Sequence, residues 1–222
     1  MDTIAILGGT GHQGGGLAQR FAAAGARVIV GSRDPERARE IVTGWNTPGE
    51  SIEVAGNAEA VDRGEVIVLA VPFTSIDALL GEVGSHFKAE AVAIDVTVPV
   101  TFAGGRMAML DVVEGSASEH IRARLPEHVS LAAAFKTLPA HVLGDPQRPL
   151  DCDEFVCADS EAARTRGIAL VELLQGLRAV DVGPLSRARS IEHMTAMAIA
   201  INRRHKIHDA RFRIVGLSGS AA

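Results

Sequence analysis

Residues 3–16 read TIAILGGTGHQGGG, a short apolar run followed at once by a loop rich in glycine. The run Thr3–Leu7 favours a buried strand, and the alanine-rich stretch Gln13–Ala24 favours a helix. Between them, Gly9–Gly14 has the spacing G-x-G-x-x-G in the strand–loop–helix context that this motif requires. Glycine permits the tight turn and lets backbone N–H groups approach a pyrophosphate at the positive end of the helix dipole. We therefore predict a dinucleotide-binding loop formed by Gly9, Thr10, Gly11, His12 and Gln13.

The rest of the chain alternates short apolar runs with helical patterns, which is typical of a doubly wound α/β fold. The apolar runs are nearly continuous, as in parallel strands that are covered on both faces. We expect a Rossmann fold in a single domain over residues 1–222, with a dinucleotide-binding core over 1–145 and additional strands and a long helix over 146–222. The predicted strands are 3–7, 27–31, 66–71, 92–96, 129–133, 154–157 and 178–182, and the predicted helices are 13–24, 35–43, 76–83, 118–125, 161–174 and 186–206.

The last predicted helix has an apolar stripe that is too wide for a helix covering one sheet face. Two interpretations fit this stripe: a dimerisation element that also completes a second-substrate site, or packing on the chain's own domain. The apolar residues concerned are Ile191, Met194, Met197, Ala198, Ile199 and Ile201.

Composition limits the possible partners and location. The chain has 222 residues and a net charge of −5, so no general basic field exists to hold nucleic acid. It begins in an apolar strand without a basic leader, and no apolar stretch approaches membrane-spanning length, so we expect a cytoplasmic protein. The two cysteines, Cys152 and Cys157, match no zinc or redox motif, and the histidines show no metal-ligand spacing. We expect small-molecule partners and no metal.

The end of the second predicted strand selects the nucleotide. An NAD-preferring Rossmann protein places an acidic residue here for the ribose 2′-hydroxyl, whereas this chain has Gly31-Ser32-Arg33. Ser32 and Arg33, with Arg37 one turn into the next helix, can converge on a 2′-phosphate. The nearby acid, in Asp34-Pro35-Glu36, has the pattern of a helix N-cap. NADP(H) is therefore the expected nucleotide.

These motifs also carry a resemblance to a known family. Gly8-Gly9-Thr10-Gly11 and Gly31-Ser32-Arg33 together resemble the NADPH-dependent reductases of the deazaflavin coenzyme F420, and more distantly the NADPH-oxidoreductase domain of the STEAP metalloreductases. Further similar stretches, in the same order along nearly the whole chain, are Ala70-Val71-Pro72, Val98-Pro99-Val100, Gly115-Ser116-Ala117, Thr137-Leu138-Pro139-Ala140, Gly183-Pro184-Leu185 and, in the last helix, Glu192, Thr195 and Ile201-Asn202-Arg203-Arg204.

The resemblance implies roles for individual residues. Val71 and Pro72 would border the nicotinamide ribose, and Ala140 would lie near the nicotinamide. Val98, Pro99 and Thr195 would seat the deazaflavin ring, and the family is dimeric through its terminal helices. Some members carry histidine at the position of Lys136. A lysine there could donate a hydrogen bond to a ring carbonyl and stabilise charge that develops on reduction, or it could mark a different electron acceptor.

The expected chemistry is direct hydride transfer between NADPH and coenzyme F420, with no catalytic side chain. The cofactors carry such chemistry, while the protein supplies alignment and a dry cleft. The chain shows no Ser-His-Asp arrangement and has no tyrosine for a short-chain dehydrogenase relay. Three alternatives stay open at this point: an FMN, FAD or ferric-chelate reductase, an imine or ketone reductase, and a non-catalytic module that senses NADPH.

Overall fold

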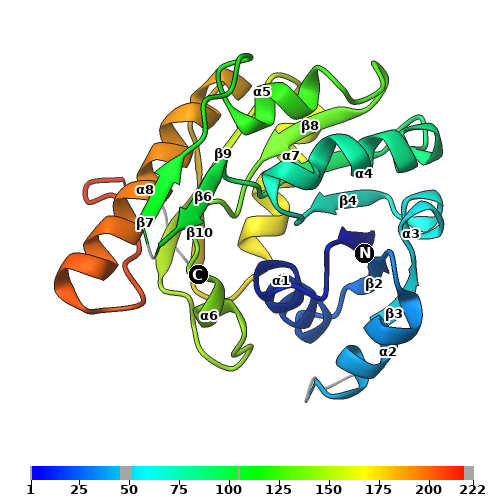
Figure 1. The fold of residues 1–222 in the computed structure, drawn as a ribbon, viewed down its shortest axis with the longest axis horizontal. Helices are drawn as coiled ribbons and strands as arrows, with labels where there is room; N and C mark the ends of the chain where they lie inside the picture. Colours follow the sequence, from blue (N-terminus) through cyan, green and yellow to red (C-terminus); the bar gives the residue numbers. More distant parts are fainter. Residues whose placement is uncertain (1, 46–51, 105, 218–222) are drawn as a thin grey trace.

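The computed structural model describes residues 2–45, 52–104 and 106–217. Eight strands form one twisted sheet in the order β10-β9-β8-β5-β4-β1-β2-β3, with helices on both faces (Figure 1). The strands are β1 (Thr3–Leu7), β2 (Arg27–Ser32), β3 (Ile52–Gly56), β4 (Val66–Leu69), β5 (Val92–Asp95), β8 (Ser130–Ala133), β9 (Cys152–Ala158) and β10 (Leu177–Asp181). The helices are α1 (His12–Ala23), α2 (Pro35–Thr43), α3 (Asn57–Arg63), α4 (Ile76–Val83), α5 (Ala117–Arg122), α6 (Ala140–Leu143), α7 (Glu161–Glu172) and α8 (Ala188–His205).

The alternation of side chains along β1 explains the two-sided core. Ile4 and Ile6 belong to a buried cluster that includes Phe21 of α1 on one face. Ala5 and Leu7 belong to a second buried cluster on the other face. A strand that buries both faces needs apolar residues at every position, which is what the sequence of β1 provides. The predicted Rossmann fold is confirmed.

Two strands, β9 and β10, run opposite to the other six and depart from the parallel sheet that we expected. β9 runs antiparallel to β8, with Ala132 opposite Ala158, although β9 and β10 are parallel to each other. A buried strand has the same apolar pattern in either direction, so its composition does not report which way it runs. The sheet is therefore mostly parallel, with one antiparallel pair.

Several short elements were not predicted. The edge strand β3 is only partly buried and carries Glu53, and the seven-residue α3 follows it directly. The hairpin of β6 (Val100–Ala103) and β7 (Arg106–Met109) forms a separate two-stranded sheet beside α8 (Figure 1). Such elements lack the long apolar periodicity on which the prediction depends.

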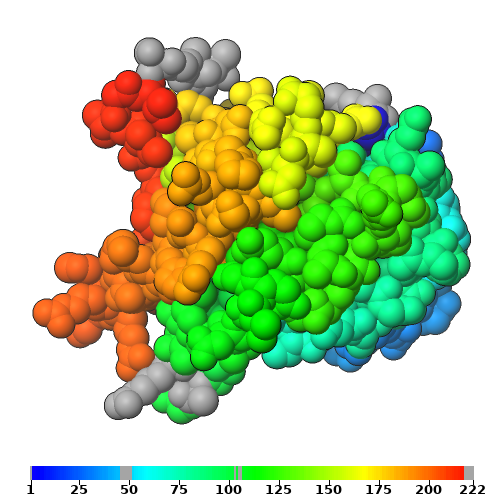
Figure 2. All heavy atoms as spheres, turned by 90° about the horizontal axis from the view of Figure 1, so that it is seen from above, coloured from blue at the N-terminus to red at the C-terminus, as the bar shows by residue number. Residues whose placement is uncertain are grey.

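The last turns of α8 project from the body of the molecule (Figure 2). No helix in the described ranges is both long and apolar enough to span a membrane.

Candidate functional site

The glycine loop after β1 has a geometry that excludes side chains. Gly8 has a φ of +81°, and a Cβ atom there would lie 2.7 Å from the carbonyl oxygen of Ala70. At Gly14 a Cβ atom would lie 2.5 Å from the carbonyl oxygen of Gly8. The turn is closed by a 3.0 Å hydrogen bond that the Gly11 N–H donates to the Gly8 carbonyl, and α1 begins at the next residue, His12. The loop therefore brings bare backbone and the N-terminus of a twelve-residue helix to one spot, which suits a pyrophosphate.

A cavity of about 790 Å³ begins at this loop and extends toward the end of β2. It brings together several of the residues predicted to bind the nucleotide, from segments far apart in the sequence. These are Thr10 and Gly11 of the loop, Ser32 at the end of β2, Arg33 and Arg37 after it, and Val71 and Pro72 after β4. Gly9 lies beneath the loop, where a Cβ atom would lie 2.9 Å from the Ile6 carbonyl oxygen.

The segment after β2 places its cations by local hydrogen bonds. Asp34 is the N-cap of α2, since its Oδ1 accepts a 3.1 Å hydrogen bond from the Arg37 N–H, and Pro35 takes the first helical position. This confirms the capping role predicted for Asp34. The Ser32 hydroxyl donates to the Asp34 carbonyl at 3.0 Å and accepts from the Asp34 N–H at 3.1 Å. Arg33 and Arg37 are both exposed on the cavity wall, so their guanidinium groups can reach an anion in the cavity.

A second cavity of about 430 Å³ lies on the other side of the glycine loop. Thr10 and Gly11 line both cavities, whereas His12 and Ala140 line only the smaller one. The predicted position of Ala140 near the nicotinamide is not tested by this arrangement. The Gln13 side chain links the loop to the next region, because its Nε2 donates a 2.7 Å hydrogen bond to the Phe135 carbonyl.

The structure revises the interpretation of Lys136. Its side chain is fully buried, and its ammonium group donates to Asp95 Oδ2 at 2.6 Å, to Glu192 Oε1 at 3.2 Å, and to the Thr97 carbonyl. An ammonium group has three hydrogens, so these acceptors use its full donor capacity. In this structure Lys136 therefore has no hydrogen left to donate to a ring carbonyl of the substrate, which is one of the two roles considered for it.

Lys136 instead connects three parts of the molecule. Asp95 ends β5, Lys136 lies just beyond β8, and Glu192 is on α8. The carboxylate of Asp95 also accepts a 2.7 Å hydrogen bond from the Thr97 N–H and a 2.6 Å hydrogen bond from the Ser118 hydroxyl. Asp95 thus caps the end of its strand and also forms a buried ion pair.

The pKa shifts in this network follow from burial and charge. Burial alone would lower the pKa of Lys136, but the adjacent carboxylates of Asp95 and Glu192 outweigh it and raise that pKa. Burial raises the pKa of Glu192, opposed by Lys136. Glu154 is buried and accepts hydrogen bonds from the Lys136 N–H and the Thr137 hydroxyl, at 2.9 and 2.6 Å. Burial raises its pKa to about 7.

The residues expected to seat the acceptor ring lie around this network. Val98 is half-buried and Pro99 is buried, directly after Thr97. Thr195 lies on α8, and its hydroxyl donates to the Lys136 carbonyl at 2.9 Å, which ties α8 to the loop after β8. The structure thus gathers Val98, Pro99 and Thr195 near one junction, while their contact with a ring stays a prediction.

Sequence reasoning missed several functional candidates. Asn57, Thr74, Ser75 and Glu82 line the larger cavity, because the unpredicted α3, the turn before α4 and α4 itself form part of its wall. Asp95, Glu154 and Glu192 carried a signal that could have been used, since each is a carboxylate within a buried apolar element. Such residues are rarely buried unless they are paired or protonated.

The two cysteines are poorly suited to act as reactive thiols. Burial raises the pKa of the Cys152 and Cys157 thiols to about 12, which disfavours the reactive thiolate. In the part of the chain that the structure describes, no group of three or more His, Cys, Asp or Glu residues is arranged to hold a metal ion.

Comparison with known proteins gives a consistent result. The family described as NADP oxidoreductase, coenzyme F420-dependent, matches residues 3–99. The F420-dependent NADP reductase of Methanothermobacter marburgensis is 38% identical over 221 residues, which cover 96% of this chain and 98% of the relative. A crystal structure from an Arthrobacter species, described as a candidate F420-dependent NADP reductase, is 25% identical with a TM-score of 0.84, covering 97% of this chain and all of the other. The 3-hydroxyisobutyrate dehydrogenase of Mycobacterium tuberculosis shares the fold, at 16% identity and a TM-score of 0.64 over 92% of this chain and 62% of the dehydrogenase.

Proposed function

This chain belongs to the F420-dependent NADP reductase family, and from that premise we propose that it transfers a hydride between NADP(H) and coenzyme F420. The observation that carries the proposal is the cavity that joins the glycine loop to Arg33 and Arg37. A diphosphate at the loop and a 2′-phosphate at the arginines fit one elongated anionic ligand, and NADPH has that charge distribution.

The residues of this chain would bind and orient the two reactants. Gly9, Thr10, Gly11, His12 and Gln13 would hold the diphosphate, and Val71 and Pro72 would direct the nicotinamide end away from β2. The bound nucleotide and the deazaflavin supply the redox chemistry, so the protein needs to align two rings and exclude water. No catalytic side chain is assigned.

The acceptor side is proposed to lie where Val98, Pro99 and Thr195 would seat the deazaflavin ring over the nicotinamide, with Ala140 near the nicotinamide itself. The shape of this acceptor side would depend on Lys136, because its ammonium group joins Asp95 at the end of β5 to Glu192 on α8. Lys136 would then act as a positioning residue and not as a ligand of the deazaflavin.

An acceptor screen tests the proposal. NADPH and NADH are each mixed with F420, FMN, FAD and a cyclic imine, and oxidation of the nicotinamide is followed by its absorbance. We expect rapid oxidation of NADPH with F420, and much slower oxidation of NADH. Activity with FMN or FAD but not F420 would select a flavin reductase, and activity with the imine alone would select an imine reductase. Tight NADPH binding without turnover of any acceptor would indicate a sensing module.

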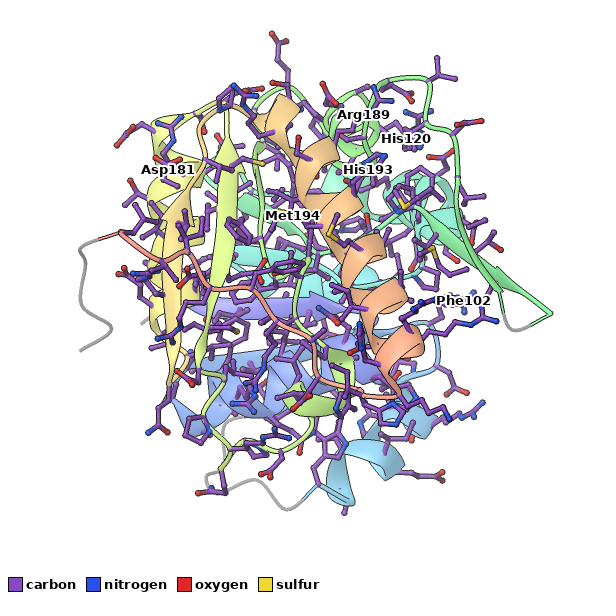
Figure 3. All side chains as sticks on the ribbon, turned by 90° about the vertical axis from the view of Figure 1, so that its left-hand side faces the viewer. Phe102, His120, Asp181, Arg189, His193 and Met194 are labelled. Carbon is purple, nitrogen blue, oxygen red and sulfur yellow. The ribbon has the colours of Figure 1, made fainter. Side chains whose placement is uncertain are left out.

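We also propose that the protein forms a homodimer through α8, and that it acts in the cytoplasm as the sequence predicts. Met197 and Ile201 of α8 are 58% and 36% exposed, and Phe102 of the hairpin is 65% exposed. Figure 3 shows Phe102 on the hairpin that lies alongside α8. Apolar side chains exposed together in this way are typical of an association surface. Light scattering should give twice the mass of the 23.3 kDa chain, and the double substitution Phe102→Glu, Met197→Glu should give the monomer mass.

A further inference from the structure

Two polar side chains in the larger cavity have no role in binding phosphate. Asn57, at the start of α3, is 4% exposed, and its Nδ2 donates a hydrogen bond to Glu82 Oε1 at 3.4 Å. Glu82 is exposed in the last turn of α4, and both residues line the cavity. The pair therefore forms a polar patch on the part of the wall made by α3 and α4, whereas Arg33 and Arg37 come from the segment that follows β2.

The charge of this patch conflicts with phosphate binding. The cavity attracts anions at the N-terminus of α1 and at Arg33 and Arg37. Glu82 adds a negative charge to the C-terminal end of α4, where the helix dipole is also negative. This part of the wall repels anions and favours a neutral group with N–H donors. The patch and the arginines thus suit different chemical groups of one ligand.

We propose that Asn57 and Glu82 recognise the amino edge of the adenine ring. This inference depends on the proposed function, because it needs NADP(H) in the larger cavity. The cavity wall also supplies apolar side chains for the faces of a flat base, namely Ala38 and Ile41 of α2 and Ala78 and Leu79 of α4. Ile41 is 36% exposed, so covering its surface would be favourable.

The hydrogen-bonding pattern of the pair matches adenine. The Glu82 carboxylate is an acceptor, and the Asn57 amide has a second N–H beyond the one bound to Glu82. Adenine presents the reverse arrangement on its edge, with an amino donor next to a ring-nitrogen acceptor. Hypoxanthine has a carbonyl in place of the amino group and a protonated ring nitrogen, so both of its groups mismatch. Loss of two modest hydrogen bonds corresponds to a difference in affinity of about tenfold.

The test compares NADPH with reduced nicotinamide hypoxanthine dinucleotide phosphate, which differs only at this edge. Dissociation constants are measured by calorimetry for the unsubstituted protein, for Glu82→Ala and for Glu40→Gln. Glu40 is an exposed carboxylate on α2 that is not among the residues lining the cavity, so Glu40→Gln controls for the loss of one negative charge. We expect the unsubstituted protein and Glu40→Gln to prefer NADPH about tenfold, and Glu82→Ala, which keeps the hydrogen bond from Asn57, to prefer it only about threefold.

Equal affinities of the unsubstituted protein for the two nucleotides would overturn this inference while leaving the proposed function intact. A preference that survives Glu82→Ala unchanged would also overturn it. If neither nucleotide binds, the proposed function fails as well, so the two failures are distinguishable. Circular dichroism of Glu82→Ala should match that of the unsubstituted protein, because the side chain is exposed.

Discussion

The larger cavity and the network around Lys136 use charge in opposite ways. In the cavity, Arg33 and Arg37 stand exposed on the wall, where their charge can act on a ligand. Around Lys136, one ammonium and two carboxylates are buried and are paired with one another. An exposed charge contributes little to folding and much to binding, whereas a buried pair is costly to break. The first region is expected to set ligand affinity and the second to fix the shape of the site.

Removing the buried cation should have the largest effect. Lys136→Met leaves the carboxylates of Asp95 and Glu192 buried without their cation, so we expect a loss of about 3–5 kcal/mol in the free energy of unfolding, measured in urea. The control Lys88→Met, at an exposed lysine, should change the free energy of unfolding by less than about 0.5 kcal/mol. The double substitution Lys136→Met, Glu192→Gln should recover part of the loss. A loss of under 1 kcal/mol for Lys136→Met would contradict the expectation that the buried charges matter more for stability than the exposed ones.

The pH dependence of stability should report Glu154. Its pKa is raised from 4.5 to about 7, so between these values the folded state binds more protons than the unfolded state. Its contribution to stability is complete below about pH 4.5 and is lost as the pH rises to about 7, by at most about 3 kcal/mol. Urea unfolding from pH 5 to 8 should show that the free energy of unfolding declines less steeply with pH for Glu154→Gln than for the unsubstituted protein. Glu90→Gln, at an exposed site, should keep the pH dependence of the unsubstituted protein. Identical slopes in all three proteins would show that Glu154 titrates normally.

Removing an exposed cation should affect binding alone. Arg33→Ala should weaken NADPH binding by about 1.5–3 kcal/mol, the contribution of a charged hydrogen bond, and should leave NADH binding unchanged. Its unfolding free energy should stay within about 0.5 kcal/mol of the original. Arg39→Ala removes an exposed cation of the neighbouring α2 that does not line the cavity, and it is the control. An equal loss for NADPH and NADH would contradict the assignment of Arg33 to the 2′-phosphate.

The sequence by itself determined the Rossmann fold, the glycine loop and the segment Gly31-Ser32-Arg33. Each of these depends on residues that are close in the chain, because a strand, a turn and a helix start follow local rules of periodicity and glycine geometry. The N-cap at Asp34 is of the same kind, since its partner Arg37 is three residues away.

Only the tertiary structure decided the partners of Lys136 and the wall of the larger cavity. Lys136 reaches Asp95 across 41 residues and Glu192 across 56, and Asn57 meets Glu82 across 25. A lysine in isolation could face a ligand or an ion pair, and no local pattern distinguishes them. The choice depends on which side chains the strand order brings together, and burial then makes pairing obligatory because an unpaired charge in the core is too costly.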